Sequence, residues 1–202
     1  MTIRLLAPIA LLALTAGTAR ADARFAALHD HARLVDSLPS FLERYVGHCE
    51  EEATRAECEE RLRAERRTLD GHAFSASIGE QTLGIVRPEH TNAGYRFVVT
   101  PFIDGGGIAL THGEPRQQDA AGHPLIALLV VEGRLPEGMD ELGLESALRT
   151  GRLEMEVIFR PEGAWRLKRK GAPGFYRGVR ARFLGLRLVE SRSGAEIAAK
   201  VF

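Results

Sequence analysis

The sequence predicts an α+β protein in which an N-terminal disulfide-stapled helical hairpin packs on an antiparallel β-sandwich or open β-barrel with one later short helix. Apolar residues recur at helical spacing from Phe25 to Cys49. After Gly71 this spacing gives way to short alternating segments bounded by Gly, Pro and Asn, which is typical of strands and turns. Both cysteines, Cys49 and Cys58, fall in the helical part.

The beginning of the chain matches a secretory signal peptide. Arg4 supplies a basic start, Leu5 to Ala16 is apolar, and Ala19-Arg20-Ala21 offers the small-x-small site of a signal peptidase. The apolar run is shorter than the roughly 20 residues that a membrane span needs. We expect a periplasmic or secreted protein that is mature from Asp22, with no transmembrane segment in the mature chain.

Three segments follow from these patterns. Residues 1–21 are expected to be the signal peptide, residues 22–71 the helical hairpin and residues 72–202 the antiparallel β domain. A length of 202 residues is enough for one domain, or one domain with a subdomain, to bury a core.

Pro39 divides the first helical pattern, so two helical pieces or one kinked helix are expected before Cys49. Ser37 can cap the second piece, because a serine hydroxyl accepts a free N–H of the first turn. The next helix should run from Arg55 to about Leu69.

The start of this 55–69 helix carries a capping-box pattern in Thr54 and Glu57, and Gly71 is expected to end the helix.

The spacing of the cysteines constrains the connection between these helices. In one continuous helix the Cα atoms of Cys49 and Cys58 would lie about 13 Å apart, whereas a disulfide needs less than about 7 Å. The chain must therefore turn back between them. An oxidising compartment favours the disulfide, and the nine-residue separation matches neither a zinc knuckle nor a thiol oxidoreductase motif.

Alternation of apolar and polar residues predicts the later elements. Residues 74–78 and 82–86 are expected to form a hairpin. The apolar run Leu125 to Val131 predicts a central strand covered on both faces. The polar face of residues 178–190 switches sides, which indicates a bulge near Leu184 and Gly185. Other strands are expected at 95–103, 153–160 and 195–201, and a helix at 139–149.

The residues that could carry chemistry form no recognised catalytic frame. No Gly-x-Ser-x-Gly elbow is present, and the glycine run at 105–107 lacks the Gly-Lys-Ser/Thr ending of a phosphate loop. We predict no catalytic residue, no cofactor and no metal. The segment 104–124 is the longest irregular region, and its His and Asp side chains are the nearest approach to a metal site: Asp104, His112, Asp119 and His123.

Net charge singles out no partner, because 27 Lys and Arg balance 27 Asp and Glu. The distribution is uneven: residues 160–192 hold ten Lys or Arg against two Glu, whereas residues 50–60 hold six Glu against one Arg. A basic side of this kind attracts anionic partners. Aromatic and basic residues in the first of these segments form the binding candidate: Trp165, Lys168, Arg169, Lys170, Arg180 and Arg182. The alternative is a β-hairpin in which the Trp165 side chain is buried in the core and the lysines lie at the exposed end of the hairpin.

Four short stretches resemble a family of exported bacterial proteins of unknown function. They are Tyr45-Val46-Gly47-His48-Cys49, Ala109-Leu110-Thr111 with Gly113 and Pro115, Phe159-Arg160-Pro161 with Gly163 and Trp165, and Gly178-Val179 with Ala181-Arg182. The similarity spans most of the mature chain and implies a bacterial periplasmic setting, but no activity, substrate or site residue.

These patterns favour a non-enzymatic envelope protein that binds a ligand or partner, such as an anionic envelope component or another envelope protein; no nucleic acid is expected. The alternative is a metal-assisted hydrolase that uses the 104–124 segment, and a third hypothesis is a purely structural envelope component.

Overall fold

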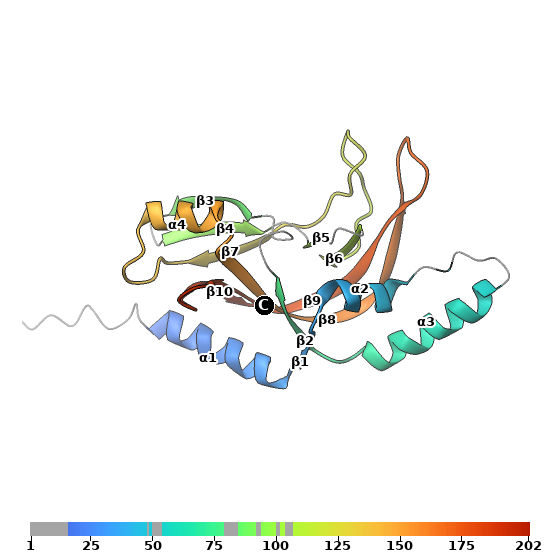
Figure 1. The fold of residues 1–202 in the computed structure, drawn as a ribbon, viewed down its shortest axis with the longest axis horizontal. Coiled ribbons are helices and arrows are strands. Elements are labelled where there is room, and N and C mark those ends of the chain that lie inside the picture. The colour runs from blue at the N-terminus through green and yellow to red at the C-terminus, as the bar shows by residue number, and fades with distance from the viewer. Residues whose placement is uncertain are drawn as a thin grey trace, which may run out of the picture.

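A computed structural model describes residues 16–47, 49, 54–78, 85–91, 94–99, 102–103 and 107–202. Within these residues the chain forms four helices and a ten-stranded sheet (Figure 1). The elements are α1 (Ala16–His31), β1 (Arg33–Leu34), α2 (Leu38–Val46), α3 (Arg55–Leu69), β2 (Phe74–Ile78), β3 (Ile85–Thr91), β4 (Gly94–Val99), β5 (Phe102–Ile103), β6 (Ile108–His112), β7 (Leu129–Gly133), α4 (Glu141–Arg149), β8 (Leu153–Lys168), β9 (Phe175–Glu190) and β10 (Glu196–Val201).

The sheet is open and mostly antiparallel, which confirms the α+β class. Its strand order is β1-β2-β8-β9-β10-β7-β4-β3. The first half of β9 also pairs in parallel with β6, which in turn pairs with β5, and β1 pairs in parallel with β2. The long β8–β9 hairpin is therefore the spine of the sheet, and its far end projects away from the other strands (Figure 1).

Helix α2 covers part of this spine and joins it in one hydrophobic core. Phe41 lies between Phe74 of β2 and Phe159 of β8, with ring centroids 4.8 and 5.4 Å apart. Leu42 and Tyr45, on the same side of the helix, are fully buried. Ser37 accepts the backbone N–H of Ser40, so the predicted cap of this helix is confirmed.

Helix α3 contributes little to the core, because Leu69 is its one buried residue. Polar bonds hold it to α2 instead: Arg44 pairs with Glu65 at 2.8 Å, and the Arg66 guanidinium donates to the carbonyl of Tyr45 at 2.7 Å. The Tyr45 hydroxyl donates to Asp70 at 2.5 Å. Burial, reinforced by this bond, raises the pKa of Tyr45 well above its usual value.

The predicted disulfide is present, since Cys49 and Cys58 are bonded with their Cα atoms 5.8 Å apart. The boundaries predicted for α3 are confirmed, but its predicted cap is wrong. Thr54 makes no capping bond because its backbone, at φ −111° and ψ 7°, departs from the extended conformation typical of a capping residue.

The predicted hairpin of residues 74–78 and 82–86 is wrong. β2 pairs with β1 and β8, and the strand that begins at Ile85 pairs with β4. Residues 79–84 lie outside the described residues. Alternation identifies a strand but not its partner, and the antiparallel partner of β2, strand β8, lies about eighty residues further along the chain.

Two boundaries also differ from the prediction. The strand expected from Leu125 begins only at Leu129, and Leu125 and Leu128 are half exposed. The Leu125 N–H donates to the carbonyl of Gln117, so this stretch is tied to the preceding loop rather than to the sheet. The segment 104–124, expected to be irregular, contains the buried strand β6.

The predicted bulge in β9 is confirmed. Ile158 pairs with Gly185 and Phe159 with Phe183, so Leu184 has no partner across the pair. The extra residue shifts the alternation of side chains by one position, which explains why the polar face of this strand changes sides.

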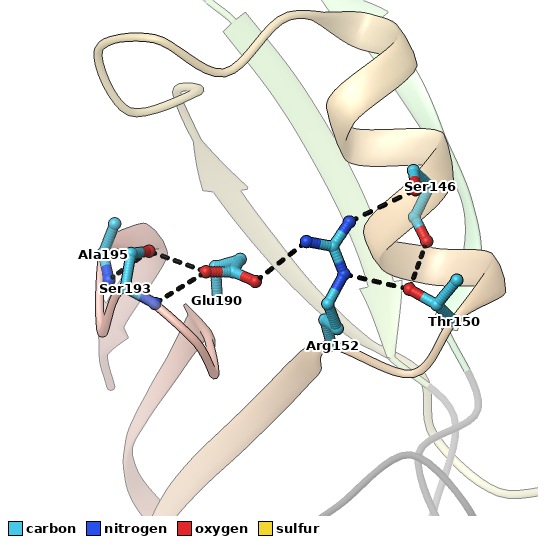
Figure 2. Close-up of polar contacts among 6 residues, drawn as sticks. All are labelled: Ser146, Thr150, Arg152, Glu190, Ser193 and Ala195. Atoms are coloured by element: carbon cyan, nitrogen blue, oxygen red, sulfur yellow. Dashed lines mark hydrogen bonds and ion pairs between the residues drawn. The ribbon is translucent and has the colours of Figure 1, made fainter.

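A polar network fixes α4 against the end of the sheet (Figure 2). Arg152 donates to the side chains of Ser146 and Thr150 near the end of the helix, and it pairs with the buried Glu190 at 3.4 Å. Glu190 also accepts the hydroxyl and N–H of Ser193 in the β9–β10 turn. Those bonds from Ser193, followed by a bond from the Arg192 N–H and by the Arg152 charge, lower the pKa of Glu190.

Candidate functional site

The candidate site is a cavity of about 900 Å³ between the α2–α3 pair and the outer half of the β8–β9 hairpin. Among the residues that the structure describes, its lining is strongly cationic, because Glu59 is the one carboxylate there. Six arginines from three elements and the hairpin turn face it: Arg55, Arg63, Arg66, Arg166, Arg169 and Arg177.

Three of these arginines are held in place by the protein. Arg66 donates to the carbonyls of Tyr45 and Val46, and Arg177 donates to the carbonyl of Gly47 at 3.1 Å. Arg63 pairs with Glu60 at 3.5 Å. These bonds orient the guanidinium groups, and the carboxylates of Glu60 beside Arg63 and of Glu43, 3.7 Å from Arg177, offset part of the charge.

The other three have no carboxylate partner among the residues that the structure describes. Arg169 lies over the ring of Tyr176, with the guanidinium carbon 4.8 Å from the centroid. Arg55 at the start of α3 and Arg166 on β8 are exposed. Both guanidinium groups can therefore contact a ligand without first breaking an ion pair to a described residue.

The cavity also has an apolar part. Val46 and Leu62 line it from the helices, and Ala164 lines it from β8. Phe175, at the start of β9, lines it and is 55% exposed. The site therefore suits a ligand that carries negative charge together with some apolar surface.

Trp165 contributes to the wall of this cavity but is only 3% exposed. Its indole N–H donates to the Thr111 hydroxyl at 3.0 Å, and its ring lies against Gly178, where a Cβ atom would be 2.5 Å away. Because the ring is enclosed in this way, it has no open face on which a sugar or a base could stack.

The other predicted binding residues do not gather at one place. Arg169 lines the cavity, whereas Lys168 and Lys170 are exposed at the end of the hairpin. Arg180 pairs with Glu114 at 3.7 Å, and Arg182 pairs with Glu162 at 3.0 Å.

Sequence reasoning missed the arginines of α3, whereas Arg166 and Arg177 belong to the basic segment 160–192 that it singled out. Arg55, Glu59, Leu62 and Arg66 recur at helical spacing and so share one face; this stripe was the signal that could have found the site.

The segment considered for metal binding serves local structure. The His112 ring lies 5.9 Å from that of Phe183. Asp119 pairs with His123 at 3.4 Å and accepts its N–H, and that backbone bond is the main reason why the pKa of Asp119 is lowered. Asp104 lies outside the described residues. Within the part of the chain that the structure describes, no three His, Cys, Asp or Glu side chains form a group that could hold a metal ion.

This segment nevertheless contacts the end of the β8–β9 hairpin. The Gln118 amide donates to the carbonyl of Lys168 at 2.6 Å, and its oxygen accepts the N–H of Lys170 at 2.9 Å. Two segments that the sequence presented as separate candidates are therefore neighbours in the fold.

The fold and the site together define a disulfide-containing α+β protein with an arginine-lined cavity. Within the described residues, no helix has the length and apolar character needed to cross a membrane. The chain belongs to a family of unknown function, DUF6066, whose model matches residues 1–201. Neither the curated proteins nor the solved structures contain a match to it.

Proposed function

We propose that this protein is an exported, non-enzymatic binding module whose arginine-lined cavity takes an anionic ligand or an anionic segment of a partner. The observation that carries the proposal is that the described residues around a cavity of about 900 Å³ include six arginines and one glutamate. Cavities of this size accommodate small ligands. A guanidinium group binds carboxylate or phosphate through two parallel hydrogen bonds, which makes arginine better suited to such groups than lysine.

Export is the second part of the proposal. A disulfide between Cys49 and Cys58 is consistent with an oxidising compartment outside the cytoplasm. Removal of residues 1–21 would leave Phe25, which is 1% exposed and lies against Arg187 of β9, to anchor the remainder of α1. The envelope is therefore the proposed location, and a bacterial periplasm is the proposed setting.

The finer organisation of the fold belongs to the same proposal. We take residues 22–71 as the helical part and residues 72–202 as the β part. Contacts of residues 44 with 65 and 49 with 58 support an antiparallel α2–α3 hairpin. Core residues from both ends of the strand order, such as Phe74 and Phe97, share one cluster, which supports a sheet curved into an open barrel.

The test uses inorganic tripolyphosphate as the probe, followed by calorimetry and by the emission of Trp165, the one tryptophan of the chain. We expect the wild-type protein to bind it and the Arg55→Ala/Arg166→Ala double variant to bind at least tenfold more weakly. Loss of two charge-assisted bonds, about 1.5 to 3 kcal/mol each, is sufficient for this change.

The matched control is the Arg149→Ala/Arg192→Ala double variant. It removes the same charge from exposed positions that do not line the cavity. An equal loss of binding in both double variants, or no binding by the wild-type protein, would contradict the proposal.

A further inference from the structure

The outer half of β8 has one edge without a strand partner in the described part of the chain. On one side β9 pairs with β8 over its whole length, from Leu153 to Lys168. On the other side β2 pairs only with Met155 to Phe159. From Arg160 onward, this second edge presents main-chain N–H and C=O groups that a further strand could use.

The cavity lies against the outer half of β8. Ala164, Trp165 and Arg166, three consecutive residues of this strand, line it. Trp165 pairs with Gly178 and Arg166 with Arg177. Because successive side chains of a strand point to opposite faces, residues of both faces border the cavity.

Only part of this edge is suited to pairing. Pro161 has no N–H, and the pairing with β9 shifts between Pro161 and Gly163, so the strand is irregular there. At the far end, Gln118 already occupies the carbonyl of Lys168. The segment from Ala164 to Leu167 lies between these two interruptions.

Charge indicates what could lie along this segment. Arg166 belongs to it, and Arg55 and Arg63 face the same cavity from α3. An inorganic anion would use the guanidinium groups and leave the main chain unused. An extended peptide uses both, because its backbone matches the spacing of a neighbouring strand and its side chains reach charged groups beside it.

We propose that the ligand is an acidic peptide segment in extended conformation, which adds as a strand to the edge of β8 at residues 164–167. Its Asp or Glu side chains contact Arg55 and Arg166, and its main chain bonds to the free edge. This inference rests on the anion-binding role proposed above and names the class of partner for that site.

The experiment compares three acetylated and amidated hexapeptides of alternating Glu and Thr. One is unmodified, one is N-methylated at the Glu residues and one at the Thr residues. In an added strand, alternate N–H groups point toward β8 and the others point away. We expect the unmodified peptide to bind, one methylated peptide to bind at least tenfold more weakly, and the other to bind like the parent. Amide hydrogen exchange within residues 164–167 should slow when the parent peptide is bound.

The outcomes separate this inference from the proposed function. If tripolyphosphate binds but the peptide does not, or if both methylated peptides behave alike, strand addition is wrong and the anion site stands. If neither probe binds, both proposals fail.

Discussion

The disulfide between α2 and α3 gives the most direct test of how the helical part is stabilised. We consider the Cys49→Ser/Cys58→Ser double variant, which removes the bond without leaving a lone thiol. The crosslink acts mainly on the unfolded chain, whose conformational freedom it restricts. For a separation of nine residues, the loop-closure relation gives about 2.6 kcal/mol at 25 °C.

The value of about 2.6 kcal/mol applies if the folded state is unchanged when the disulfide is removed, and the contacts between α2 and α3 indicate that it is. Arg44 and Arg66 hold α2 and α3 together independently of the cysteines. Since these bonds remain in the double variant, α3 should stay in place and the loss should come from the unfolded state. We therefore expect the free energy of unfolding to fall by about 2.6 kcal/mol while the folded state keeps its helix content.

Urea denaturation measures this change with two signals: far-ultraviolet circular dichroism for the helices and Trp165 fluorescence for β8. Reduction of the wild-type protein should reproduce the effect, whereas the reductant should leave the double variant unchanged. A loss below about 0.5 kcal/mol would refute the reasoning. Loss of helix signal before urea is added would show that the crosslink holds α3 in its native position.

Three further predictions concern the sheet and its polar network. The pKa of Glu190 is lowered from its ordinary value of 4.5, so the ionised Glu190 side chain stabilises the fold fully above pH 4.5, and this stabilisation is lost as the pH falls through the folded-state pKa. When the free energy of unfolding is measured against pH in the acid range, it should decline less steeply for Glu190→Gln than for the wild-type protein. Parallel curves would contradict this. Gly178→Ala should lower stability by about 1 to 3 kcal/mol, because the new Cβ would lie 2.4 Å from the Ala109 carbonyl oxygen and 2.5 Å from the Trp165 ring; an unchanged urea midpoint would show that the ring can move aside. Phe159→Ala removes a fully buried ring that packs on Phe41 and Phe74 and should cost about 3 to 5 kcal/mol in thermal or urea unfolding; a loss below 1 kcal/mol would exclude Phe159 from the cooperative core.

Local patterns determined much of the secondary structure. Ser37 and Pro39 placed the start of α2, and the switch of polar face in residues 178–190 located the bulge at Leu184. These features depend on neighbours within a few residues, so the sequence is sufficient to predict them. The disulfide also followed from the sequence, because two cysteines allow only one pairing within the chain.

Strand pairing and the candidate site were decided by the tertiary structure. The antiparallel partner of β2, strand β8, lies about eighty residues away. Arg55 and Arg166 are separated by more than one hundred residues, yet both line one cavity. Basic residues that are close in sequence, such as Arg169 and Arg182, are separated because the strands carry them to different places. Local spacing assigns a residue to a face of its own element, but only long-range packing decides which faces meet, and it was this packing that gathered the arginines around the cavity.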